Sequence, residues 1–246
     1  MWPMPAKDFR ILWREKSFRL ILFGVLVMMV GLARAANGSQ SAPGWNLLGQ
    51  SLPFLAIWLL GGLCFNALAY EGPGLALLLG SPAPRWRVLL SKNVTLLWFM
   101  LAVMGLGEGV LLAQGSRGIV LLRDCALAVT VSLLYMGGGN IASVLWPFPA
   151  SLSEKASKGK ISPARIFTLS VLQFAIMLFV MVAAVPLLSG WYALAAFERA
   201  GPLFWTLACA MVAYSVTAYA LLLAWAGRLM GAREPEIFES LVRQAG

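Results

Sequence analysis

The chain has 246 residues, of which 60% are hydrophobic and 12% are charged, and its formal net charge is +9 at pH 7. A soluble domain carries about 25% charged residues, so this composition excludes a soluble globule and, with apolar runs of about 20 residues, predicts an all-α polytopic membrane protein. Histidine is absent, which excludes imidazole metal sites and Ser–His–Asp triads. The cations lie mainly in the predicted loops, where membrane orientation and anionic lipid account for them without a nucleic-acid partner.

The first 19 residues combine cations with aromatic side chains. Phe9 and Trp13 project to one side of a helix and Lys7 and Arg10 to another. This pattern predicts an amphipathic helix that lies in the inner headgroup layer.

The apolar run 20–36 is the first predicted span. A basic segment, an apolar core and then the sequence Ala-Arg-Ala at 33–35 also fit a cleavable signal peptide. The acidic Asp8 and Glu15 are unusual in the basic part of such a peptide, and the run is long for one. We therefore favour a retained span, followed by an uncharged external loop at 37–50.

Residues 70–93, YEGPGLALLLGSPAPRWRVLLSKN, follow a second predicted span at 52–69. Two breaker clusters, 72–74 and 80–84, enclose the short apolar patch 75–79, and Gly and Pro prevent one continuous helix. Three cations then lead into the next span, and Pro84 suits the first turn of a helix. The segment predicts a short cytoplasmic helix between spans two and three, whereas an ordinary basic loop is the simpler alternative.

The remaining predicted spans cover 94–113, 119–146, 166–188 and 203–226. The glycine triplet at 137–139 is not a phosphate-binding loop, because no Lys and Ser or Thr follow it. It predicts either close helix packing or local unwinding. The lysine-rich segment 146–165 predicts a cytoplasmic loop, with Ser162 and Pro163 starting the next helix. The tail, 227–246, mixes apolar and charged residues.

The distribution of cations predicts the orientation. When the two termini and the loops 70–93 and 146–165 lie on one side, the other side keeps four of the 19 Lys and Arg residues. These four are Arg34, Arg117, Arg123 and Arg199. This asymmetry predicts six spans with both termini in the cytoplasm. The chain is expected to form a single transmembrane domain, 1–246.

Glu108 lies between two glycines inside an apolar run. A charge at membrane depth usually faces a cavity or a partner, so Glu108 is a candidate pathway residue. Counting from Lys92 at about 1.5 Å per residue places it roughly 24 Å along the helix, near the outer interface. A shallow, wetted carboxylate paired with Arg117 or Arg123 is therefore the structural alternative.

The order E-G-x-G, an apolar stretch, S-P, and then R and K before a span resembles the permease subunits of type-2 (ABC-2-like) ABC exporters. The resemblance implies that 1–19 is an elbow helix and that the segment after span two is a coupling helix resting on an ATPase subunit. It implies a coupling role for residues of this segment, namely Glu71, Gly72, Leu75, Leu77, Leu78, Pro82 and Arg85.

The predicted function is that of an exporter permease in the cell membrane, most simply a bacterial inner membrane. The chain itself is expected to be no enzyme and to bind no cofactor or metal, since ATP and Mg²⁺ would be bound by a partner ABC ATPase. A second permease subunit, identical or related, and membrane lipid are the other expected partners. The alternatives are a membrane assembly factor that transports nothing and an intramembrane enzyme acting on lipids.

Overall fold

The computed structural model describes residues 79–113, 118–145, 163–195, 201–237 and 239, with isolated positions among the first 68 residues. Its four long helices are α5 (Arg85–Ala113), α6 (Gly118–Leu145), α8 (Pro163–Ala195) and α9 (Pro202–Ala232). The predicted elbow helix at 1–19 and the spans 20–36 and 52–69 lie, except for those isolated positions, outside the described residues. The same is true of the predicted coupling residues Glu71, Gly72, Leu75, Leu77 and Leu78.

The described part of the chain is all-helical, as the sequence predicts. Three of its helices contain stretches that are long and apolar enough to cross a membrane, Arg85–Gly109, Leu122–Leu145 and Pro202–Ala232. In α8, the described residues include a shorter apolar stretch, Leu178–Leu187. These helices fit an all-α membrane protein, whose spanning segments must satisfy their own backbone hydrogen bonds.

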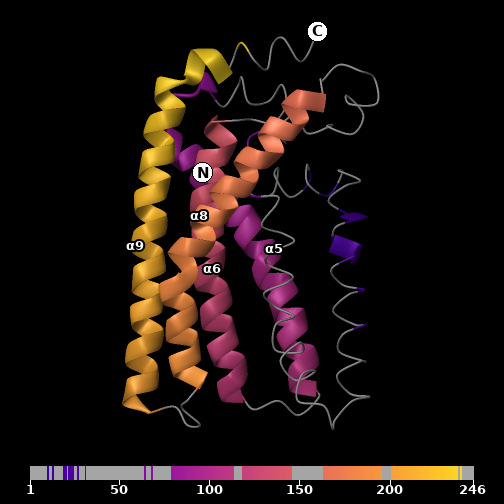
Figure 1. The fold of residues 1–246 in the computed structure, drawn as a ribbon, viewed down its shortest axis with the longest axis vertical. Helices are drawn as coiled ribbons and strands as arrows, with labels where there is room; N and C mark the ends of the chain where they lie inside the picture. The colour runs from indigo at the N-terminus through magenta and orange to yellow at the C-terminus, as the bar shows by residue number, and fades with distance from the viewer. Residues whose placement is uncertain are drawn as a thin grey trace.

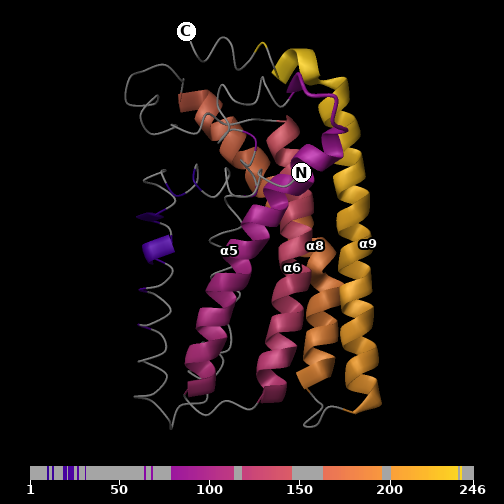
Figure 2. The same ribbon diagram turned by 180° about the vertical axis from the view of Figure 1, so that it is seen from behind.

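The helices run side by side, with α6 at the centre of the described bundle (Figure 1, Figure 2). Helix α6 contacts α5, α8 and α9. The beginnings of α5 and α8 and the ends of α6 and α9 lie at one end of the bundle, called here the Arg85 end. The opposite end, where α5 finishes and α6 begins, is called the Glu108 end. The helix ends that adjoin the predicted cytoplasmic loops and tail therefore lie together, at the Arg85 end.

Proline begins three of the four helices or directly precedes them. Helix α8 starts at Pro163 and α9 at Pro202, while α5 starts immediately after Pro84, whose carbonyl accepts from the Arg87 amide at 2.9 Å. A proline at this place costs no hydrogen bond, because the first amides of a helix have no partner within it. Helix α5 starts earlier than the predicted span at 94, so its first three turns carry Arg87 and Lys92.

Helix α8 continues through Pro186 to Ala195, past the predicted end of the span at 188. Proline removes one helical hydrogen bond and disturbs the carbonyls of the preceding turn. On the neighbouring helix, the Tyr214 hydroxyl donates to the Ala183 carbonyl, which lies in that turn, at 3.0 Å. A donor from an adjacent helix thus fixes the backbone beside Pro186, and neighbouring helices help spanning helices to tolerate proline in this way.

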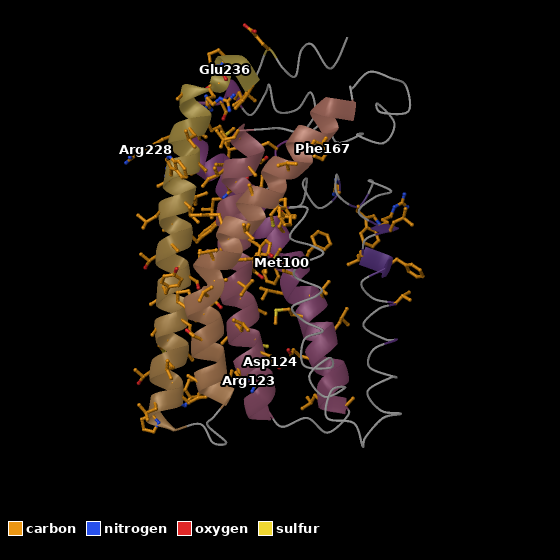
Figure 3. All side chains as sticks on the ribbon, viewed as in Figure 1. Met100, Arg123, Asp124, Phe167, Arg228 and Glu236 are labelled. Atoms are coloured by element: carbon orange, nitrogen blue, oxygen red, sulfur yellow. The ribbon has the colours of Figure 1, made fainter. Side chains whose placement is uncertain are left out.

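Most large apolar side chains of α8 and α9 that the structure describes point away from the bundle. In α9 they include Trp205, Leu221 and Trp225, and in α8 they include Phe167, Phe174 and Phe179 (Phe167 is labelled in Figure 3). In a membrane protein such side chains face lipid or another subunit, because lipid tails are as apolar as they are. The described helices accordingly lack a single dominant apolar face.

Glycines on α6 set how closely its neighbours approach. A Cβ atom added at Gly139 would lie 2.7 Å from the backbone carbon and oxygen of Cys64, and one at Gly137 would lie 2.7 Å from Leu222 Cδ1. The helix is continuous through 137–140. Close packing is therefore the correct interpretation of the glycine triplet, and local unwinding is wrong.

Candidate functional site

At the Arg85 end, one guanidinium group joins two distant segments of the chain. Arg85 Nη2 lies 2.8 and 2.7 Å from the two carboxylate oxygens of Glu234, and Arg85 Nε lies 3.0 Å from one of them. The same guanidinium donates to the carbonyls of Leu79, Ser81 and Ala83 at 2.6, 3.1 and 3.4 Å. Arg85 thus ties the turn before α5 to the residues that follow α9.

The geometry explains why arginine occupies this position. The guanidinium offers five donors in a planar fork, which matches one carboxylate and several carbonyls at once, and a lysine ammonium cannot reproduce this pattern. The side chains of Arg85 and Glu234 are 18% and 33% exposed, so water screens their attraction in part. The main contribution of the group is consequently to fix the turn before α5 relative to the residues that follow α9.

A second arginine closes the end of α6. Arg233, the residue after α9, donates from Nη1 to the Leu145 carbonyl at 2.9 Å and pairs with Glu236 at 2.8 Å. The last carbonyls of a helix have no partner within it, and a cation is favourable there. Figure 3 shows Glu236 beyond the upper end of α9. Two arginines therefore join the start of α5, the end of α6 and the end of α9.

Close backbone packing reinforces these contacts. A Cβ added at Gly227 of α9 would lie 3.0 Å from the backbone nitrogen and Cβ of Trp86. Leu79 and Ile237, which lie far apart in the sequence, are buried in one apolar cluster with Val88, Val144 and Met230. The turn that precedes α5 is thus packed against the helices of the bundle.

The predicted coupling residues divide into two groups. Arg85 and Pro82 are described: Arg85 makes the contacts above, and Pro82 is exposed in the turn between Leu79 and α5. The rest lie outside the described residues. Sequence analysis missed Arg233, Glu234 and Gly227, because the partners of the coupling segment lie about 150 positions along the chain and no local pattern links them.

Removing the Arg85 guanidinium is expected to loosen this end of the protein. Arg85→Gln should lower the free energy of unfolding by about 2 kcal/mol, because hydrogen bonds to a charged group are lost and Glu234 is left without them. Arg85→Lys should recover little of this loss. The measurement is the free energy of unfolding in mixed micelles.

Arg87→Gln is the matched control. The exposed Arg87 stacks on Trp86 at 5.3 Å, and its loss should cost no more than about 1 kcal/mol. Equal losses for the two variants would contradict this assignment.

Farther into the bundle, polar side chains join the helices. Asn93 donates to the Tyr219 hydroxyl at 2.8 Å, and the Leu68 amide donates to Ser143 Oγ at 2.9 Å. Asn140 is fully buried, and none of the described residues is a hydrogen-bond partner of its amide. Interhelical hydrogen bonds of this kind stabilise membrane helix pairs by about 0.6 kcal/mol on average. The two bonds therefore define the pairing of α5 with α9, and of α6 with the segment around Leu68, more than they strengthen it.

At the Glu108 end, an ion pair lies inside the bundle. Arg123 Nε is 3.0 Å from Asp124 Oδ1, and the two side chains are 10% and 0% exposed. Figure 3 shows both residues in the lower part of α6. Glu108 of α5 is 7% exposed, and neither of its oxygens has a hydrogen-bond partner among the described residues. Glu108 is therefore buried in the structure, Arg123 pairs with Asp124, and Arg117 lies outside the described residues.

The described ranges contain no group of three or more His, Cys, Asp or Glu side chains that could hold a metal ion. No family model, no curated protein and no solved structure matches this chain.

Proposed function

We propose that this chain is the transmembrane permease subunit of an ATP-driven ABC exporter. It is a six-span protein of a cell membrane, most simply a bacterial inner membrane, with both termini in the cytoplasm. It works with a separate ABC ATPase and with a second permease subunit, either another copy or a related chain. The proposal is supported by the resemblance of residues 70–93 to the coupling region of such permeases and by the three membrane-length helices.

The observation that supports it most is the set of contacts made by Arg85. In an exporter of this class, the segment between spans two and three receives a push from the ATPase and must pass it to the spans. Here the turn at 79–84 is bonded through Arg85 to Glu234, beyond α9, and packs with α5 through Leu79 and Val88. A displacement of this turn would therefore act on α5 and α9 together.

The transport cycle follows from this linkage. ATP and Mg²⁺ bind to the partner ATPase, which presses on the apolar patch 75–79. Helices α5 and α9 then tilt against α6, and the pathway formed with the second permease subunit opens on the other side of the membrane. The permease performs no covalent chemistry, and its part is to convert this movement into alternating access.

The substrate class is hydrophobic or amphipathic. Of the charged side chains in the described helices, four are buried: Lys92 toward the Arg85 end, and Glu108, Arg123 and Asp124 near the opposite end. The rest of the bundle offers apolar side chains and isolated hydroxyl and amide groups. A molecule with an extended apolar part would cross such a path, or enter it from the lipid, without losing strong interactions with water.

The direct test is a charge in the apolar patch. Leu77→Asp and Leu78→Asp should abolish ATP-linked transport and co-purification of the ATPase, because a carboxylate would have to be buried without a partner in the subunit contact. Insertion in the membrane should be unchanged. Ser153→Asp is the matched control, since it adds the same charge to another predicted cytoplasmic loop and should leave transport intact.

Transport at the wild-type rate in both leucine variants would contradict the proposed coupling segment. Loss of transport in the Ser153→Asp control as well would show that added charge on this side is harmful by itself. In that case the patch would have no special part in coupling.

A further inference from the structure

Glu108 has surroundings that do not suit an ionised carboxylate. It lies near the end of α5, is 7% exposed, and neither carboxyl oxygen accepts a hydrogen bond from a described residue. One turn earlier on the same helix, Met104 packs with Ala128, Cys125 and Val131 of α6. Transferring an ionised carboxylate to such a place costs several kcal/mol unless a cation or several donors compensate it.

The nearby cation is engaged with another acid. Arg123 holds Asp124 at 3.0 Å, and the charges of both residues act on Glu108, with opposite signs. Cys125 is the other titratable group of α6 that interacts with Glu108. Helix α9, which also packs against α5, carries a single charged residue, Arg228, at the Arg85 end, as Figure 3 shows. With Glu108 ionised, the side chains of Glu108, Arg123 and Asp124 together would carry a net charge of −1 inside the bundle.

We infer that Glu108 is a proton-binding site, occupied at neutral pH while α5 and α6 are packed together at this end. A proton removes the unfavourable charge and requires no additional volume. When α5 and α6 separate and water reaches the carboxyl group, hydration favours the ionised form and the proton leaves.

The protonation state of Glu108 would therefore depend on whether α5 and α6 are packed together at this end of the bundle. The carboxyl group and the ion pair belong to different helices, so any movement that separates α5 from α6 changes the water content around Glu108. The inference concerns the chemistry of this chain alone. It holds or fails independently of the proposed transport function.

The test uses the full-length protein in lipid nanodiscs. Infrared spectra in H₂O and D₂O should contain the carbonyl band of a buried protonated carboxylic acid at neutral pH, with the shift that deuteration causes. The band should be absent from Glu108→Gln, a variant of the same size that mimics the neutral acid and is expected to fold. It should disappear in the wild type at alkaline pH.

Labelling with the apolar reagent dicyclohexylcarbodiimide, which reacts with protonated carboxyl groups, assigns the band to a residue. Mass spectrometry should find Glu108 modified about tenfold more than Glu236, because Glu236 has a side chain that is 65% exposed, and water solvates its ionised form. A wild-type spectrum without the acid band at neutral pH would overturn the inference, whatever the labelling shows. A band that persists in Glu108→Gln would overturn it too.

Discussion

Replacing Gly139 with alanine is expected to disrupt the packing of α6 against the segment that carries Cys64. The new methyl group would lie 2.7 Å from the backbone carbon and oxygen of Cys64, and main-chain atoms cannot rotate away as a side chain can. Alanine is a better helix former than glycine by about 1 kcal/mol, but overpacking a tight contact costs about 1–3 kcal/mol and occasionally more. Because a backbone contact lies at the severe end of this range, we expect a net loss of about 2 kcal/mol.

Alanine substitutions at two other glycines are expected to cost less stability, which gives a graded series of three variants. Gly137→Ala should cost less, because the nearest atom, 2.7 Å away, is the Cδ1 end of the Leu222 side chain. Gly105→Ala on α5 meets nothing within 4 Å and should be neutral or slightly stabilising. Unfolding in mixed micelles ranks the three variants, and equal behaviour of Gly139→Ala and Gly105→Ala would contradict the close approach seen at Gly139.

Removing Arg123 is expected to have the largest effect on stability. Arg123→Leu leaves Asp124, which is completely buried, without its cation, and breaking a buried ion pair in this way costs about 3–5 kcal/mol. The double variant Arg123→Leu/Asp124→Leu should be markedly more stable than Arg123→Leu, because no uncompensated charge remains. Unfolding in mixed micelles gives the comparison.

A matched control for this prediction is Arg228→Leu. It removes the same charge from an exposed position of α9 and should change the free energy of unfolding by about 0.5 kcal/mol or less. If Arg123→Leu were no less stable than Arg228→Leu, the ion pair would have no structural role. A double variant no more stable than Arg123→Leu would show that the charge of Asp124 is not the source of the loss.

Local signals in the sequence were sufficient to predict the described helices. Their apolar length predicts α5, α6 and α9, and the prolines at 84 and 163 predict where α5 and α8 begin, because a first-turn proline costs no hydrogen bond. The end of α8 was harder to predict. Pro186 resembles a terminator, but α8 continues, with the Tyr214 hydroxyl supplying a donor that the sequence of α8 does not contain.

The candidate site was predictable only in part, because it depends on contacts between distant positions. The pattern around Arg85 was visible in the sequence, but its partner Glu234 was not. Glu108 was placed correctly near one end of its helix by counting residues, yet the face on which it lies was not, since α5 is apolar around its whole circumference. The six-span topology and the elbow helix remain predictions.

The contacts at the Arg85 end explain how a movement of the coupling segment would be passed to the spans. An exporter permease must keep its coupling segment attached to the spans that move, and here a half-buried arginine, a second arginine at 233 and a glycine contact at 227 join α5, α6 and α9. The Glu108 end has no such set of arginine contacts among the described residues. It is the end at which α5 and α6 are expected to separate.

The most direct test of the proposed function is to identify what the native protein binds. The tagged wild-type chain would be extracted into lipid nanodiscs under mild conditions, after cross-linking in the membrane, and its partners identified and assayed for ATP hydrolysis. The proposal predicts a stoichiometric ABC ATPase whose hydrolysis depends on the permease and whose association is lost in Leu77→Asp. A pure preparation without any nucleotide-binding chain, repeated with cross-linking, would contradict the assignment as an exporter permease.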